Sequence, residues 1–307
     1  MELNQLRYFV AVAELRSFTK GARRCGVSQP SLSQQIQKLE SELGHPLLDR
    51  LGRRYQLTEA GSALYERATA ILDAVDDARQ SVQQGDDWQS GTISIGAIHS
   101  IAPYLLPEIV ARFNQRIPAA QVMVEERLTE QLVERSLAGE LDVAIVATPI
   151  AESRVRVEPL FTEKLLAAVP AGSALAGRTQ LALDDLMTEP FVLLDDMHCL
   201  GRQTLRLCTD HNCTPAVSCR TAQLLTVQEF VSLGQGVSLV PEMAACNDQD
   251  RRRVYRPLRD ASFEREIAAM WRPRYRPKKL LEAVLELLRE LGRERAAARS
   301  GDENGST

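Results

Sequence analysis

The sequence predicts an α/β fold in three parts: an amino-terminal winged helix-turn-helix, a long linker helix, and a domain of two linked Rossmann-type α/β subdomains. Three observations predict it. Residues 1–58 divide into three short amphipathic segments and a basic hairpin, residues 59–84 keep one helical register without a proline, and residues 92–146 alternate between strand and helix patterns. The predicted boundaries are 1–58 for the first domain, 59–90 for the linker helix and hinge, 91–300 for the α/β domain, and 301–307 for a flexible tail.

Length and composition predict a cytoplasmic protein with enough apolar content for two or three packed domains. The net charge of −4 means that any surface for nucleic acid has to be local. Glu2 and Arg7 stand near the amino terminus, no signal-peptide core follows, and no apolar run could span a bilayer, so no membrane partner is expected. Six cysteines in 307 residues are too few for a disulfide scaffold, and cytoplasmic thiols are normally reduced.

The first 58 residues predict three helices that share one core. Apolar positions from Leu6 to Leu15 mark the first helix, and Ser17 can cap a second one. Ser28 can cap a third, with Pro30 in its first turn, where the missing N–H costs nothing. The remaining residues expected to face this core are Phe18, Ala22, Cys25, Leu32, Ile36, Leu39 and Leu43.

The third helix and the hairpin after it predict a DNA-binding surface. The exposed face of the helix is polar and nearly uncharged, and such side chains can hydrogen-bond base edges and phosphates in a major groove. Residues 49–58 predict a two-stranded wing whose basic tip would contact phosphates. A solvated helical domain would also be polar, but the local balance of nine basic against five acidic residues over 1–58 favours DNA. The predicted DNA-binding residues are Gln29, Pro30, Ser31, Ser33, Gln34 and Lys38 on the helix, with Gln37 beside them, and Arg50, Arg53 and Arg54 on the wing.

The linker helix carries an apolar seam over nearly three heptads. Its members recur at alternating spacings of four and three residues, which is typical of helices that pair with one another. We therefore predict a dimerisation helix that holds two DNA-reading domains on two half-sites. The alternative is a helix packed within its own subunit. The seam residues are Leu64, Ala68, Ile71, Val75, Ala78 and Val82.

The remaining residues predict two α/β units with a cleft for a small ligand between them. Strands over 92–96, 122–124 and 141–146 enclose a helix that opens at Ser100 and another over 128–137. A second unit starts with a strand over 165–169 and continues with a strand over 191–194, a helix near Cys199, a helix over 224–233 and a strand over 237–240. A strand over 267–271 returns to the first unit, and a helix from 278 to about 299 follows it.

The segment from Asp195 to Cys208 is the candidate sensor. If a helix opens near Cys199, then Cys199 and Cys208 lie on its opposite faces, roughly 13 Å apart along the axis. A disulfide needs Cα atoms within about 7 Å, so these thiols could bond only if the helix unwound. From the spacing alone, two small packing residues remain the simpler interpretation, as they do for Cys25 and Cys246.

Motifs in both halves resemble the LysR-type transcriptional regulators. In the amino-terminal part the resemblance rests on residues 9–14, on 27–33, on Leu43-Gly44 and on Leu57-Thr58-Glu59-Ala60-Gly61. It implies that the helix from Ser28 to Leu43 lies in the major groove, and that the second half resembles periplasmic binding proteins. The family also implies a homodimer or homotetramer on double-stranded promoter DNA, working with RNA polymerase.

Within that family, Pro103-Tyr104-Leu105-Leu106-Pro107 and the Asp195–Cys208 stretch look like the peroxide-sensing OxyR branch. That resemblance implies that peroxide oxidises Cys199 to a sulfenic acid and that Cys208 resolves it into a disulfide, with Cys213 as a competing partner. We also expect a helix amino terminus and a guanidinium to lower the pKa of Cys199. Positions implied to bind the thiol, the peroxide or its water are Ser100, Thr129, His198 and Arg265.

Three alternatives remain open. A LysR-type regulator could instead hold an organic acid in the interdomain cleft, with Ser100, Thr129 and Arg265 on its carboxylate. A metal sensor could use residues between His198 and Cys219, although no zinc spacing appears there. A cysteine-dependent peroxidase would leave the amino-terminal domain unexplained. We therefore expect a regulator of the oxidative stress response that is not an enzyme and uses neither a cofactor nor a metal.

Overall fold

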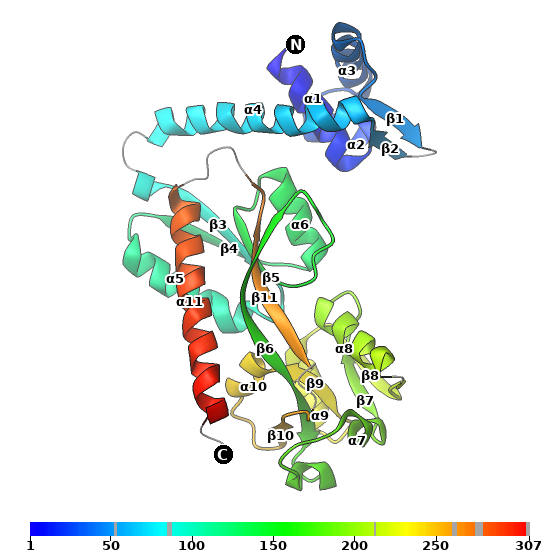
Figure 1. Ribbon diagram of the computed structural model, residues 1–307, viewed down its shortest axis with the longest axis vertical. Helices are drawn as coiled ribbons and strands as arrows, with labels where there is room; N and C mark the ends of the chain where they lie inside the picture. The colour runs from blue at the N-terminus through cyan, green and yellow to red at the C-terminus, as the bar shows by residue number, and fades with distance from the viewer. Residues whose placement is uncertain (52–53, 85–87, 212, 260–262, 274–278, 305–307) are drawn as a thin grey trace. The chain divides into compact units, whose positions relative to one another are not determined.

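The computed structural model describes residues 1–51, 54–84, 88–211, 213–259, 263–273 and 279–304 (Figure 1). The chain forms two compact units, one from Met1 to Trp88 and one that begins at Gln89. The mixture of helices with strands confirms the predicted α/β class. Among the described residues, no helix is both long and apolar enough to cross a membrane.

The first unit contains the three predicted helices and the hairpin. They are α1 (Leu3–Leu15), α2 (Phe18–Arg24), α3 (Gln29–Leu43), β1 (Leu48–Leu51) and β2 (Arg54–Leu57). Both predicted caps form, since the Ser17 hydroxyl accepts a hydrogen bond from Lys20 N at 3.3 Å and the Ser28 hydroxyl accepts one from Ser31 N at 3.3 Å. Its core includes residues that bury almost their entire surface, among them Leu6, Phe9, Val12, Leu32, Ile36 and Leu39.

The prediction that Leu43 belongs to this core is wrong. Leu43 is 38% exposed, because it is the last residue of α3 and the chain turns away there at Gly44, which has a φ of 73°. A side chain of α3 holds the segment that follows this turn. The Glu40 carboxylate accepts hydrogen bonds from Leu47 N at 2.8 Å and from Leu48 N at 3.3 Å. This contact ties the start of the wing to the third helix.

The linker helix α4 runs from Glu59 to Gln84, as predicted. Its first turns pack on the core of the same unit, where Ala68 is fully buried and Leu64 is partly buried. Farther along, Ile71 is 38% exposed and Ala78 is exposed as well. The predicted seam therefore divides: its first two residues are covered by the chain's own domain, and later ones face outward from it.

The second unit opens with a parallel sheet, as predicted. After a short 3-10 helix η1 (Trp88–Ser90), the order is β3 (Thr92–Ala97), α5 (Ala102–Arg116), β4 (Gln121–Glu126), α6 (Thr129–Ala138) and β5 (Val143–Ala147). β3 pairs in parallel with both β4 and β5. Ser100 does not open α5, which starts two residues later; it lies in the turn between β3 and α5.

Two long strands connect this first subdomain with a second one. β6 (Arg156–Pro170) pairs antiparallel with β11 (Glu264–Trp271), and β11 pairs with β5, so the sheet order is β10-β6-β11-β5-β3-β4. The far end of β6 pairs with β9 and β10 of the second subdomain. The predicted strand over 165–169 is thus only one end of a continuous 15-residue strand.

The second subdomain is built around β7 (Phe191–Leu194), which matches its prediction. Successive residues of its strands alternate between two apolar clusters: Ala167, Leu193 and Leu239 belong to one, and Ala168, Leu194 and Val240 to the other. The other elements are η2 (Ala174–Gly177), α7 (Leu183–Met187), α8 (Cys199–Asp210), β8 (Val217–Thr221), α9 (Leu224–Ser232), β9 (Ser238–Pro241), α10 (Glu242–Cys246) and β10 (Arg253–Arg256).

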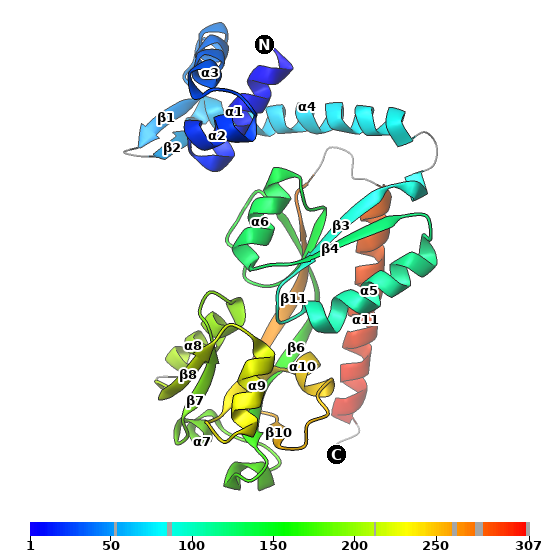
Figure 2. The same ribbon diagram turned by 180° about the vertical axis from the view of Figure 1, so that it is seen from behind.

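The last helix, α11 (Lys279–Asn304), packs beside α5, as Figures 1 and 2 both show. Ion pairs join the two helices, with Arg116 Nη2 lying 2.8 Å from Glu290 and Arg112 Nη2 lying 2.9 Å from Glu294. The predicted tail is wrong in its first part, because the helix continues through Asn304. The rest of that tail, residues 305–307, lies outside the described residues.

Candidate functional site

The candidate sensor begins where β7 ends and α8 starts. His198 N donates to Asp195 O at 3.0 Å and Met197 N donates to the Asp195 carboxylate at 2.9 Å, which closes a tight turn before Cys199. Gly201 then allows α8 to lie against the strand end, because a Cβ there would stand 2.5 Å from Asp195 O and closer still to Leu194 O. The first residue of α8 is therefore Cys199, as the sequence predicted.

Cys199 lines a small cavity between the two subdomains. The other lining residues come from the turn after β3, from the start of α6 and from the turn before α8; they are Ile98, His99, Ser100, Leu128, Thr129 and His198. The cavity is partly open to solvent and offers about 10 Å³ to the centre of a water-sized molecule, which is about the room that one water needs. Three predicted pocket residues and the predicted thiol thus meet at a site suited to a very small molecule.

Arg265 is not among the residues that line this cavity, but it bonds to one of them, Ser100. Its Nη1 donates to Ser100 Oγ at 2.7 Å, its Nη2 donates to Ser100 O at 3.1 Å, and its Nε donates to the Glu163 carboxylate at 2.7 Å. Both the arginine and the glutamate are buried. A buried ion pair with these additional hydrogen bonds holds Ser100 in place, and it leaves little of the guanidinium for a ligand.

The pKa of Cys199 differs from the prediction. Burial raises it, and this effect outweighs the opposing influence of Arg265, Thr129 and Arg202. The Thr129 hydroxyl is buried and finds no partner of ordinary hydrogen-bond geometry among the described residues, yet it lies near enough to Cys199 to favour the thiolate. The resting site thus holds a protonated thiol beside an unsatisfied hydroxyl.

Two histidines meet at the cavity. The rings of His99 and His198 pack edge to face with centroids 5.0 Å apart. Burial lowers the pKa of His198, and the neighbouring His99 lowers it further, so His198 is neutral at physiological pH. His99 Nδ1 is buried and has no hydrogen-bond partner in the described part of the chain. Both the neutral His198 and Cys199 line this cavity.

The second predicted redox residue, Cys208, lies at the other end of α8, apart from the cavity. It is 1% exposed, and burial together with the neighbouring Cys213 raises its pKa to about 12. Nine residues of regular helix place Cys199 and Cys208 roughly 13 Å apart along the axis and on opposite faces. In the reduced fold, the cysteine next to Cys208 is Cys213.

Two contacts join the start of α8 to the first subdomain. Arg202 Nη2 donates to the Glu130 carboxylate of α6 at 2.8 Å, and Gln203 Nε2 donates to Thr148 O, just after β5, at 3.0 Å. Arg202 also reaches back to Asp196 O at 3.0 Å. We call Arg202 and Gln203 the α8 clamp, because both bonds depend on α8 being helical at this point.

The predicted DNA-binding residues of α3 lie on its outer face. Ser33 is half-buried, and the others are exposed: Gln29, Pro30, Ser31, Gln34, Gln37 and Lys38. The hairpin pairs Arg50 with Tyr55 and Leu51 with Arg54. Arg53 lies outside the described residues, as do the side chains of Arg50, Arg54 and, on the linker helix, Val82.

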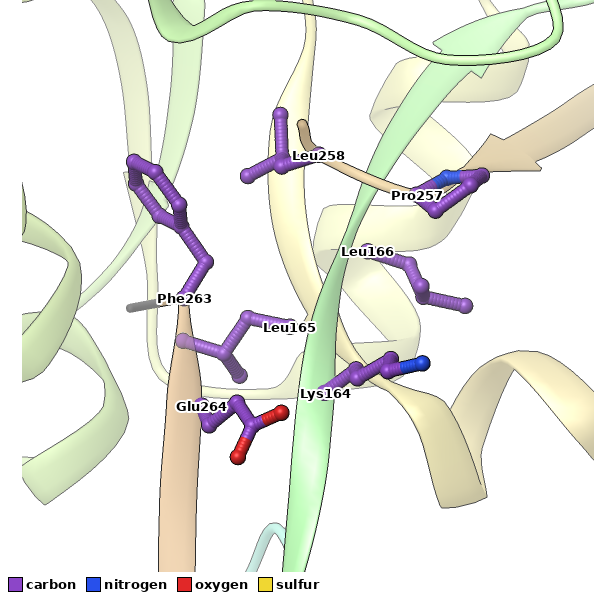
Figure 3. Close-up of a pocket in the computed structure, with 7 residues that line it drawn as sticks. All are labelled: Lys164, Leu165, Leu166, Pro257, Leu258, Phe263 and Glu264. Atoms are coloured by element: carbon purple, nitrogen blue, oxygen red, sulfur yellow. The ribbon is translucent and has the colours of Figure 1, made fainter. Parts of the chain in front are cut away.

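Cys25, Cys246 and a second pocket are not part of the Cys199 cavity. Cys25 packs partly on the first unit's core, while Cys246 is exposed, so the expectation that it is a packing residue is wrong. No group of three or more His, Cys, Asp or Glu suited to a metal occurs among the described residues. A second pocket of about 240 Å³ lies along β6, where Figure 3 shows Leu165, Leu258 and Phe263, and it includes none of the predicted effector residues.

Sequence reasoning missed His99, Glu163 and the α8 clamp. A histidine two residues after the strand β3 and next to the predicted Ser100 was a usable signal for the first. Glu163 stands in an apolar strand, where a buried carboxylate requires a basic partner, although the sequence does not say which one. Nothing in the sequence pairs Arg202 with Glu130 or Gln203 with Thr148.

Two family models match the chain. Residues 3–62 match the bacterial regulatory helix-turn-helix protein of the lysR family, and residues 87–293 match the LysR substrate binding domain. The first match covers the three helices, the hairpin and the start of α4, and the second covers most of the second unit.

Individual proteins with similar sequences and structures point the same way. The hydrogen peroxide-inducible genes activator of Pectobacterium carotovorum subsp. carotovorum is 36% identical over 275 residues, which are 89% of this chain and 91% of that protein. The DNA-binding transcriptional dual regulator OxyR of Escherichia coli K12 is 35% identical over 89% of this chain and 90% of its own length. A full-length OxyR variant from Pseudomonas aeruginosa has a TM-score of 0.64 at 29% identity, with 95% of each chain covered. A hydrogen peroxide-bound OxyR mutant from Corynebacterium glutamicum has a TM-score of 0.63 at 30% identity and covers 98% of this chain and 97% of that one.

Proposed function

Because this chain belongs to the LysR family of transcriptional regulators, we propose that it senses hydrogen peroxide through Cys199 and passes the signal to its DNA-reading domain. The observation that carries the proposal is the cavity, in which Cys199 meets Thr129, His198 and a serine fixed by a buried arginine. Its small size favours a ligand little larger than water, such as hydrogen peroxide.

The chemistry uses groups that are already in place. His198, kept neutral by burial, accepts the proton of Cys199, and the Thr129 hydroxyl donates to the thiolate or to the peroxide. The thiolate sulfur attacks one peroxide oxygen and the O–O bond breaks. The leaving oxygen takes up a proton and departs as water, and Cys199 becomes a sulfenic acid.

Resolution of the sulfenic acid requires α8 to unwind. Cys208 is the proposed resolving thiol, but it lies at the far end of the helix and its buried thiol is protonated. Unwinding brings it to Cys199, releases water, and forms the Cys199–Cys208 disulfide. The same unwinding breaks the α8 clamp on Glu130 and Thr148. Local oxidation thereby changes how the second subdomain is held to the first.

The organic-acid alternative has less support. It requires Arg265 to grip a carboxylate, but Nε and both Nη atoms of this arginine already bond to Glu163 and Ser100. The cavity is also small for such a ligand.

The DNA-reading part of the proposal uses α3 and the wing. The exposed polar face from Gln29 to Lys38 would read base edges, while Arg50, Arg53 and Arg54 would contact phosphates. The later turns of α4 would pair two copies of the chain, so that two α3 helices meet two half-sites, and dimers would assemble further into tetramers. A regulator of this kind works in the cytoplasm, where the DNA is, together with RNA polymerase.

Thiol mapping of the full chain tests the proposal. The reduced protein is treated with one equivalent of hydrogen peroxide, alkylated, and analysed by mass spectrometry, with hydrogen exchange followed over residues 199–210. We expect Cys199 to lose its free thiol first, a linkage to Cys208 to follow, and exchange over α8 to rise.

The matched variants are Cys199→Ser and Cys246→Ser. The first should keep DNA affinity and lose the peroxide response, with its five remaining thiols still free, whereas the second, at an exposed thiol, should respond as the wild type does. Cys208→Ser should weaken or shorten the response. A full response in Cys199→Ser would rule out the proposed sensor.

A further inference from the structure

The third cysteine of this region, Cys213, contacts the end of α8 that carries Cys208. Cys213 N donates to Cys208 O at 2.9 Å, and the Cys213 thiol donates to the same oxygen at 3.1 Å. The two thiols also interact with each other, since Cys213 contributes to the raised pKa of Cys208. The proposed function gives Cys213 no task.

This geometry already meets the Cα distance requirement for a disulfide. The hydrogen bond from Cys213 N to Cys208 O, together with standard bond lengths, keeps the two Cα atoms within about 7 Å of each other, which is the span that a disulfide can bridge. A bond between Cys208 and Cys213 therefore leaves α8 helical. A bond between Cys199 and Cys208 does not, because the helix separates them by roughly 13 Å.

We propose that Cys213 is a second redox partner of Cys208, which takes over the disulfide from Cys199 and switches the sensor off without an external reductant. The inference rests on the proposed peroxide chemistry of Cys199. The Cys213 thiol gives up its proton, and its sulfur attacks the Cys208 sulfur of the Cys199–Cys208 disulfide. The Cys208–Cys213 bond forms, the Cys199–Cys208 bond breaks, and its electron pair leaves on Cys199, which takes up a proton. No electron enters or leaves the protein.

The direction of this exchange follows from the fold. The first disulfide keeps α8 unwound, and with it the α8 clamp broken and the buried surface of Leu200 and Thr204 disturbed. The second disulfide allows these contacts to form again. Cys213 stays close to Cys208 throughout, because only five positions of chain separate them, so its effective concentration is high even when the helix is open.

The product differs from the resting sensor although it has the same fold. Cys199 is a free thiol again, but Cys208 no longer is. A second peroxide would leave Cys199 as a sulfenic acid without a resolving thiol. The protein therefore stays unresponsive until a dithiol reductant opens the Cys208–Cys213 bond.

A time course of disulfide mapping tests this inference. The reduced full chain receives one equivalent of hydrogen peroxide in the absence of any reductant, and samples are acidified and alkylated over seconds to hours. Digestion with trypsin and an enzyme that cuts before aspartate separates the three thiols into residues 196–202, 207–209 and 210–220. The last peptide also contains Cys219, and fragmentation distinguishes it from Cys213.

We expect the Cys199–Cys208 linkage to appear first and then to be lost, with a matching gain of Cys208–Cys213 and the return of hydrogen-exchange protection over residues 199–210. In Cys213→Ser, and in Cys213→Ala as a check on packing, the first linkage should persist until a reductant is added. Cys246→Ser should behave as the wild type does.

Three results would overturn the inference, and they are distinguishable. A Cys199–Cys208 linkage that persists in the wild type rejects the exchange and leaves the proposed function intact. A Cys208–Cys213 linkage that forms at the same rate in Cys199→Ser shows direct oxidation instead of exchange. A Cys199 that peroxide never oxidises rejects the proposed function and the exchange together.

Discussion

Individual side chains around Cys199 do more than their residue types suggest. Ser100 was expected to open a helix, but it lies in the turn before α5, where its hydroxyl accepts a hydrogen bond from Arg265. Arg265 was expected among the residues that bind the thiol, the peroxide or its water, and in the structure its guanidinium bonds to Ser100 and Glu163. The residue types at the site could be predicted because Cys199 and His198 stand in a recognisable stretch. The role of each residue could not be predicted, because it depends on contacts between residues that are more than a hundred positions apart in the chain.

The burial of His198 predicts a pH dependence of stability. Its pKa is lowered in the folded state by burial and by His99, whereas the unfolded chain has the ordinary pKa of about 6.5. Below that value the unfolded state binds a proton that the folded state does not, so the free energy of unfolding falls as the pH falls. Above it, the residue has no such effect.

Urea denaturation of the wild type and of His198→Gln at pH 7.5 and pH 5.5 measures this contribution. The wild type should lose more stability than the variant on going to the lower pH, and His45 and His211 cancel in the comparison. Equal losses would show that His198 titrates in the folded protein as it does in the unfolded chain.

Among the secondary-structure elements, the starts of helices were predicted better than the length of the longest strand. Ser17, Ser28 and Pro30 fixed two helix starts correctly, and the absence of proline between residues 59 and 84 fixed all of α4. The strand β6 was predicted at only a third of its length, because Glu158 and Glu163 interrupt its apolar pattern. Arg289 and Arg265 pair with these carboxylates, and neither partner can be identified from the strand itself.

The junction of β7 with α8 depends on Gly201. In Gly201→Ala the new methyl group overlaps the backbone oxygens of Leu194 and Asp195, and the helix has to shift away. Overpacking of this kind costs about 1–3 kcal/mol, and the gain in helix propensity offsets at most about 1 kcal/mol of it. We expect a lower free energy of unfolding in urea.

Gly177→Ala is the matched control, since a Cβ at that position meets nothing within 4 Å and the residue lies away from the thiols. Its free energy of unfolding should stay within about 0.5 kcal/mol of the wild type. Equal stability of both variants would mean that α8 does not need its close approach to β7.

For the whole molecule, the linker helix decides how many chains act together. Sequence pattern predicted a seam of six residues, but it could not reveal that Leu64 and Ala68 would be used by the chain's own core. Ile71 is the large apolar side chain of the seam that its own unit leaves 38% exposed. A charge at that position should disfavour association without unfolding the domain.

Sedimentation of Ile71→Glu against Ala63→Glu measures this effect. Ala63 is exposed on the same helix and lies off the seam, so Ala63→Glu introduces the same charge outside the proposed interface. The first variant should dissociate at least tenfold more readily, which corresponds to about 1.4 kcal/mol, while the second should sediment as the wild type does. Identical association of both variants would place the interface elsewhere.

The place of β11 in the sheet affects how the chain is made. β5 has β3 on one side and β11 on the other, but residues 148–263 are synthesised between β5 and β11. At roughly 5–20 residues per second, the ribosome needs between about 6 and 23 seconds to cover that distance. Throughout this interval the strand Val-Ala-Ile-Val-Ala has an unpaired edge, which other nascent chains or a chaperone can reach. Correct assembly of this protein therefore requires protection of one short apolar strand until the chain is nearly complete.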